Sequence, residues 1–124
     1  QNNSVSIGAY QNPKEINFVI DINGKVAGSI GLANISYKHN NAEIGYWLAR
    51  EYWGNGIMTK AVNQVVNFGF NKLKLRRIQA FVFPQNKASF RALEKNGYKL
   101  EGVLKKYAMK DGKVLDDLLY AKTK

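Results

Sequence analysis

The first part of the chain holds three short apolar runs separated by polar turns. Ile16–Ile22 and Lys25–Leu32 alternate apolar and polar residues in part, and Asn23-Gly24 joins them. Asn-Gly between two such runs is the strongest short-range hairpin signal, because both turn positions require a positive φ. The polar turn Lys38–Asn41 then leads into Ala42–Ala49. We therefore predict three consecutive antiparallel strands.

After these strands the pattern changes to a helical period. Apolar residues recur at three- and four-residue spacings from Met58 to Leu73, which predicts a helix with one buried face. Arg77–Phe83 is the next strand, and Pro84 ends it. Because a helix separates this strand from Ala42–Ala49, we predict that the two are parallel and form one β-α-β unit.

The last third of the chain predicts a short helix and a second hairpin. Lys87–Asn96 has helical character, and Gly97 is placed as its C-cap. Tyr98–Leu104 and Val114–Ala121 have strand character, and Asp111-Gly112 supplies the hairpin turn between them.

The elements add up to an α+β fold: a mixed, mostly antiparallel twisted sheet with helices on its faces. Residues 1–14 mix Asn, Ser, Gln and Gly with one Pro, so we interpret them as a leader or loop. We find no internal repeat and no linker, so residues 1–124 form one domain.

The stretch from residue 43 to residue 60 carries the first functional signal. An apolar strand runs into Gly54-Asn55-Gly56, and this turn opens the long helix. The first N–H groups of a helix have no partner within it, and the helix dipole adds positive charge there, so a phosphate is a natural ligand. Asn55 is expected at or near the N-cap.

Strand alternation divides the side chains that precede this turn between two faces. Ile44, Tyr46 and Leu48 share one face and Glu43, Gly45 and Trp47 share the other. We expect the Tyr46 side chain to serve packing, and Gly45 is consistent with a β-bulge.

Composition and charge narrow the function classes. The chain has 124 residues, a net charge of +10 and no cysteine. The charge favours anionic ligands, while a thiol nucleophile and a Cys-based zinc site are excluded. The lack of cysteine fits a reducing cytoplasm, where we expect the protein. No apolar run approaches the length of a membrane span, and no metal-ligand spacing is present.

Two motifs together resemble the GNAT superfamily of N-acetyltransferases. Residues 46–61, Tyr-Trp-Leu-Ala-Arg-Glu-Tyr-Trp-Gly-Asn-Gly-Ile-Met-Thr-Lys-Ala, are similar to its acetyl-CoA signature. Residues 86–98 resemble its second signature, an Asn after a strand, a Ser three residues on, and a helix ending Leu-Glu-Lys-x-Gly-aromatic. Residues 100–105 and Asp111-Gly112 are similar to the branch that acetylates ribosomal-protein N-termini, with spermidine acetyltransferases as relatives.

The resemblance implies transfer of an acetyl group from acetyl-CoA to a primary amine by direct attack, with no covalent enzyme intermediate. It places the pyrophosphate on backbone N–H groups of the Trp53–Thr59 stretch, and pantetheine in a gap between Gly45–Leu48 and Arg77–Phe83. The cofactor-binding residues implied are Trp47, Leu48, Trp53, Gly54, Asn55, Gly56, Ile57, Met58, Thr59, Asn86 and Ser89.

The catalytic candidates are Glu43 and Ser89. Glu43 is the candidate base for the amine, directly or through a water, and the alternative is a surface or paired carboxylate. Ser89 is a candidate proton donor to the leaving thiolate, or a cofactor contact. Many relatives carry a Tyr as general acid four residues before Gly97, but Leu93 stands there, so a Tyr acid at that position is excluded. Asn86 is also a good helix N-cap.

The match to the family is incomplete at the front, where a complete member has a strand and two helices that carry part of the acceptor site. We expect these elements to be absent, shortened or supplied by another chain, and a homodimer is one way to complete the domain. The acceptor is expected to be a peptide N-terminus, a polyamine or an aminoglycoside-like amine. A non-catalytic acetyl-CoA-binding module and a ribosome- or nucleic-acid-binding module stay open as alternatives, although nucleic acid is not favoured because most aromatics fall in apolar strand patterns.

Overall fold

The computed structural model describes residues 2–6 and 13–124 of the chain. Within them the elements follow in the order β1 (Asn2–Ser6), β2 (Ile16–Ile22), β3 (Lys25–Ser36), β4 (Asn41–Leu48), the 3₁₀ turn η1 (Arg50–Tyr52), α1 (Ile57–Asn71), β5 (Arg77–Val82), α2 (Lys87–Lys95), β6 (Lys99–Lys110) and β7 (Lys113–Thr123).

The strands form one sheet in the order β1-β2-β3-β4-β5-β7-β6. Every neighbouring pair is antiparallel except β4 and β5, which are parallel. This confirms the predicted mixed, mostly antiparallel sheet and its one β-α-β unit.

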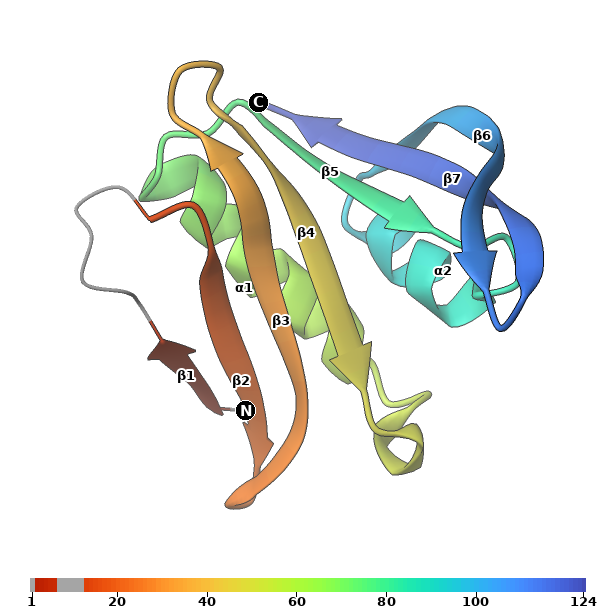
Figure 1. The fold of residues 1–124 in the computed structure, drawn as a ribbon. Coiled ribbons are helices and arrows are strands. Elements are labelled where there is room, and N and C mark those ends of the chain that lie inside the picture. Colours follow the sequence, from red (N-terminus) through yellow and green to blue (C-terminus); the bar gives the residue numbers. More distant parts are fainter. Residues whose placement is uncertain (1, 7–12) are drawn as a thin grey trace.

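The parallel pair is short, and this shortness shapes the molecule. Asn41–Glu43 pair with Arg77–Gln79, and beyond this register β4 and β5 diverge (Figure 1). The sheet is thus opened at its centre, and the carboxyl end of β4 has no β5 neighbour among the described residues.

Both helices pack on the same face of the sheet (Figure 1). Under α1 the core is built from alternate residues of the strands, such as Ile30 and Leu32, which are 1% and 0% exposed. Gly69 of α1 lies directly over Ile78 of β5, and Tyr120 of β7, on that same face, stacks on Phe90 of α2. The periodicity that predicted the buried helix face is confirmed by Ala61, Val62, Val65 and Val66, which are all buried.

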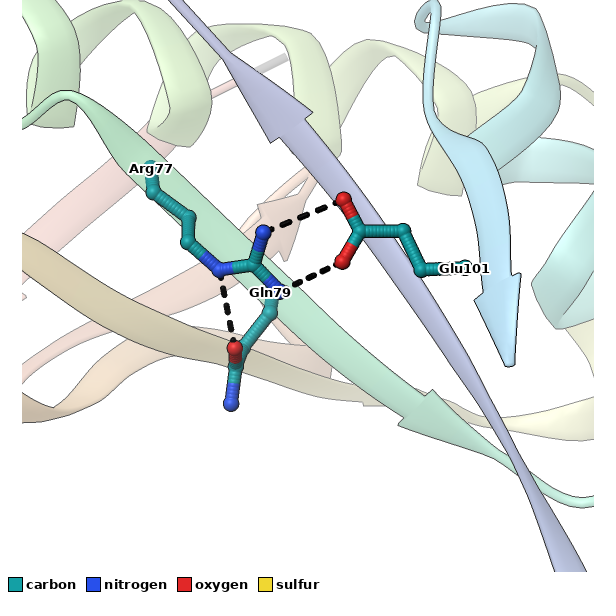
Figure 2. Close-up of polar contacts among 3 residues, drawn as sticks. All are labelled: Arg77, Gln79 and Glu101. Atoms are coloured by element: carbon teal, nitrogen blue, oxygen red, sulfur yellow. Dashed lines mark hydrogen bonds and ion pairs between the residues drawn. The ribbon is translucent and has the colours of Figure 1, made fainter. Parts of the chain in front are cut away.

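The opposite face carries a polar cluster that joins two strands across a third. Arg77 on β5 reaches over β7 to Glu101 on β6 with two hydrogen bonds of 2.8 and 3.1 Å, and its Nε donates to Gln79 Oε1 (Figure 2). The ion pair is half-exposed, so its net contribution to stability is small.

Two local expectations are wrong. Residues 2–6, placed in a leader or loop, form β1 and pair with Asn17–Asp21 of β2. No bulge occurs at Gly45, which pairs regularly with Gly31. The register shift lies instead in β3, between Ala33 and Ser36, where Asn34 has a φ of 50°. The remainder of the expected leader, residues 7–12, lies outside the described residues.

Candidate active site

A cleft of about 360 Å³ opens where β4 leaves β5, between the end of β4, the start of α1 and one side of α2. Every predicted cofactor-binding residue except Asn55 lines this cleft: Trp47, Leu48, Trp53, Gly54, Gly56, Ile57, Met58, Thr59, Asn86 and Ser89. The end of β4 and the start of α1 are thus brought together with the first turn of α2, although the individual roles of these residues stay predictions.

The glycine turn leaves the start of α1 open. Gly54 and Gly56 have φ values of 81° and 72°, a left-handed conformation that is unfavourable for other residues. A Cβ on either would meet nothing within 4 Å, so backbone conformation and not crowding requires glycine here. The N-cap is Gly56, with no side-chain hydrogen bond, so Asn55 lies next to the N-cap and does not cap the helix itself. The first N–H groups of α1 are therefore not satisfied by a cap and can bind an anion.

The edge of β4 presents backbone groups to the same cleft. Ala49 donates its N–H to Ala27 of β3 at 2.8 Å. Because successive residues of an antiparallel pair alternate in direction, the N–H and C=O groups of Tyr46 and Leu48 point away from β3, toward the gap. The Leu48 carbonyl accepts a 2.7 Å hydrogen bond from Trp53 Nε1. This bond ties the glycine turn to the strand end.

The other wall of the cleft is the first turn of α2. Asn86 is the N-cap, and its Oδ1 accepts the Ser89 N–H at 3.2 Å. Ser89 Oγ donates to the Tyr46 hydroxyl at 2.9 Å, and that hydroxyl donates to the Ser89 carbonyl at 3.1 Å. Burial raises the pKa of Tyr46 to about 12, with the Ser89 hydrogen bond opposing it. The Tyr46 side chain therefore does more than the packing expected of it: it bridges β4 and α2 across the cleft.

A buried amide holds the two helices together below the cleft. Asn96, at the C-cap of α2, is 7% exposed. Its Nδ2 donates to the carbonyl of Thr59 in the first turn of α1 at 3.0 Å, and to Ala92 at 2.8 Å.

Glu43 is not brought into the cleft. It lies on the sheet face opposite Tyr46, half-buried, and its Oε2 accepts a 3.0 Å hydrogen bond from Asn34 Nδ2. The alternative of a paired carboxylate describes this contact. Its role as the base stays a prediction and requires an amine that approaches from that face of β4.

Two charged cleft residues were not identified from the sequence. Arg91 and Lys95 line the cleft from α2 and are the only charged side chains that do so in the part of the chain that the structure describes. Their i, i+4 spacing, with Ala88 three residues before Arg91, marks one stripe of the helix and would have revealed them. The two cations favour an anionic ligand.

Two further kinds of feature, a metal-ion cluster and a membrane-spanning helix, are absent from the described residues. Across residues 2–6 and 13–124, no three His, Asp or Glu side chains gather where they could hold a metal ion. Neither α1 nor α2 has the length and hydropathy needed to span a bilayer.

Comparison with known families identifies the family to which this fold and cleft belong. The model of the family described as "Acetyltransferase (GNAT) domain" matches residues 3–99. The chain belongs to the GNAT family of acetyltransferases. The match contains both the glycine turn and the α2 wall of the cleft.

Several relatives of this GNAT chain are known by sequence. The uncharacterized N-acetyltransferase YoaA of Bacillus subtilis is 41% identical over 97 residues, 78% of this chain and 55% of YoaA. The spermidine N(1)-acetyltransferase of Escherichia coli strain K12 is 31% identical over 90 residues, 73% of this chain and 48% of that protein. The chain thus spans about half the length of the curated relatives it matches.

Solved structures agree with this. Mycobacterium smegmatis RimJ in complex with CoA-disulfide is 36% identical, with a TM-score of 0.85 over 89% of this chain and 53% of RimJ. The F149A mutant of the spermidine N-acetyltransferase SpeG from Vibrio cholerae is 26% identical, with a TM-score of 0.84 over 91% of this chain and 68% of SpeG. The GNAT fold expected from the sequence is confirmed.

Proposed function

We propose that the chain forms the acetyl-CoA site of an N-acetyltransferase and transfers an acetyl group to a primary amine. The observation that carries the proposal is the joining of an uncapped helix start and an unpaired strand edge in one cleft. Phosphates bind well at the first feature, and an extended chain with amides, such as pantetheine, can hydrogen-bond along the second.

The two ends of the cleft have different tasks in this proposal. Backbone N–H groups from Gly54 to Thr59 hold the pyrophosphate, and Gly54 and Gly56 let it approach the backbone. Arg91 and Lys95 add positive charge at the α2 wall. Asn86 Oδ1 already accepts the Ser89 N–H, and its amide nitrogen can donate to pantetheine.

The chemical step takes place at the β4 end. Acetyl-CoA supplies the thioester, whose carbonyl carbon is attacked by the neutral amine. An N–H of β4 near Trp47 and Leu48 stabilises the oxyanion, and Ser89 faces the sulfur as the C–S bond breaks. The amine gives up one proton, for which Glu43 is the candidate base.

The acceptor is a primary amine, and we propose a peptide N-terminus, a polyamine or an aminoglycoside-like amine. The relatives named for spermidine support the polyamine class. A homodimer belongs to the same proposal, as does a cytoplasmic location, which the absence of cysteine favours.

The decisive experiment is calorimetric titration with acetyl-CoA, CoA and an RNA oligonucleotide, using the wild type, Gly56→Trp and Gly112→Trp. Gly112 is the matched control, because it has a φ of 76° and equally open surroundings, but it lies in the β6–β7 turn outside the cleft. In both variants a non-glycine residue at positive φ costs about 1–2 kcal/mol of backbone strain. We expect Gly56→Trp alone to abolish acetyl-CoA binding.

The outcomes separate the alternatives. Unchanged affinity in Gly56→Trp would remove the phosphate site from this turn, and RNA binding without acetyl-CoA binding would favour the nucleic-acid alternative. If acetyl-CoA binds but no amine in a panel of peptides, polyamines and aminoglycosides releases free thiol, the chain is a binding module and the proposed transfer is refuted.

A further inference from the structure

The contact between Tyr46 and Ser89 crosses the cleft and joins residues 43 positions apart. Tyr46 lies on β4 and Ser89 in the first turn of α2, and both are half-buried cleft residues. The Tyr46 hydroxyl is 2.9 Å from Ser89 Oγ and 3.1 Å from the Ser89 carbonyl oxygen. Three oxygens thus share two hydroxyl hydrogens.

These oxygens can be connected in two ways. Each hydroxyl donates one hydrogen bond. In the first arrangement Ser89 donates to Tyr46 and Tyr46 donates to the Ser89 carbonyl. In the second, Tyr46 donates to Ser89 Oγ, and the Ser89 hydroxyl hydrogen points into the cleft. No heavy atom needs to move between the two.

We propose that Tyr46 is a positioning residue that turns the Ser89 hydroxyl toward the sulfur of the leaving CoA. This inference rests on the proposed acetyl transfer. When the C–S bond breaks, its electron pair stays on sulfur as a thiolate. Ser89 then donates a hydrogen bond to the sulfur and accepts one from Tyr46. No bond within Ser89 or Tyr46 breaks, and the thiolate takes its proton from solvent.

The weak acidity of Tyr46 disfavours the alternative that it protonates the thiolate itself. Its pKa is raised to about 12, whereas the thiol of Cys has a pKa of about 8.5. A proton would therefore stay on the tyrosine. On α2, the position one turn after Ser89 is Leu93, which is 0% exposed and carries no hydroxyl.

A neighbouring tyrosine provides a matched control. Tyr98 is 3% exposed, and its hydroxyl has no hydrogen-bond partner in the described structure. Burial, and then the nearby Tyr46, raises the pKa of Tyr98, but Tyr98 does not line the cleft. Tyr98→Phe therefore removes a nearby hydroxyl without touching the bridge.

The test is the binding of CoA and of desulfo-CoA, which lacks the sulfur, at pH 6.5 and pH 9. A thiol with the cysteine pKa of about 8.5 is about 1% ionised at pH 6.5 and about three quarters ionised at pH 9. Around the site, the charged and titratable side chains are Tyr52 on η1, Arg91 and Lys95 on α2, and Tyr98 behind Tyr46. Their contributions cancel between the two ligands.

We expect the wild type to prefer CoA over desulfo-CoA more strongly at pH 9 than at pH 6.5. A hydrogen bond to a charged group should raise this preference by about ten-fold. Ser89→Ala should lose the gain entirely and Tyr46→Phe most of it, and because the gain is a ratio between the two ligands, a change in affinity common to both cancels. Tyr98→Phe should behave as the wild type.

Once an amine acceptor is identified, kcat of the transfer reaction provides the second measurement. Tyr46→Phe should lower kcat by about five-fold in the wild type and leave kcat unchanged in Ser89→Ala, because its effect passes through Ser89. Additive losses, or a preference for CoA at pH 9 that survives in Tyr46→Phe, would overturn the inference alone. Failure of CoA and desulfo-CoA to bind at all would overturn the proposed function together with it.

Discussion

Asn96 offers the most direct test of how the cleft is held open. Its side chain connects the end of α2 to the first turn of α1, the turn that we propose for phosphate binding. The two hydrogen bonds, 3.0 Å to the Thr59 carbonyl and 2.8 Å to the Ala92 carbonyl, are made by an amide that is 7% exposed. We predict that Asn96→Ala destabilises the fold and weakens acetyl-CoA binding.

The magnitude follows from these bonds. A net intramolecular hydrogen bond contributes about 0.5–1.5 kcal/mol, and two such bonds give about 2 kcal/mol. The better helix propensity of Ala recovers a few tenths of a kcal/mol at most. For a domain of this size, about 2 kcal/mol corresponds to a drop in Tm of about 8 °C.

The assay is thermal unfolding with and without acetyl-CoA, and Asn67→Ala is the control. Asn67 is an exposed residue of α1 whose Nδ2 donates to Asn63 Oδ1 at 3.3 Å. Its truncation should change the free energy of unfolding by less than about 0.5 kcal/mol. Equal losses in Asn96→Ala and Asn67→Ala would refute the idea that the buried amide couples the helices.

Two further predictions concern the packing of α1 on the sheet and the ion pair on the opposite face of the sheet. Gly69→Ala should destabilise by about 1 kcal/mol, because its Cβ would lie 2.7 Å from Ile78 Cδ1 and overpacking outweighs the gain in helix propensity. Denaturant titration in an Ile78→Val background, where that methyl is absent, should show Gly69→Ala as stabilising, and destabilisation there would contradict the packing argument. The hydrogen bond from Arg77 lowers the pKa of Glu101, so this pair contributes stability above the unfolded pKa of Glu101 and loses it as pH falls through the lower folded pKa. The Tm difference between wild type and Glu101→Gln should therefore shrink from pH 7 to pH 3, and a constant difference would contradict this origin.

Local signals in the sequence predicted most of the elements. Asn23-Gly24 and Asp111-Gly112 form the hairpin turns, and all four residues have positive φ, as such turns require. The spacing of apolar residues located α1 and its buried face. These features depend on a few consecutive residues, so they can be recognised without knowledge of the tertiary structure.

Features that depend on distant partners could not be predicted in this way. β1 has the sequence Asn-Asn-Ser-Val-Ser, which has little intrinsic strand preference, and it is ordered by pairing along β2. At the start of α1, Asn55 has the better capping side chain, but the left-handed Gly56 takes the N-cap. A glycine there leaves the first N–H groups without a side-chain acceptor, which suits a ligand better than it suits an isolated helix.

The same distinction applies to the chemistry of the cleft. Motif spacing identified most of the residues that line it, but it assigned Tyr46 to packing because the bond to Ser89 spans 43 positions. The absence of a tyrosine at Leu93 on α2 suggested that a hydroxyl was missing. The fold places a tyrosine hydroxyl beside Ser89 from the facing strand, so the cleft holds a tyrosine hydroxyl that the sequence of α2 does not reveal. A departure from a motif on one wall of a cleft is therefore interpretable only after the opposite wall has been examined.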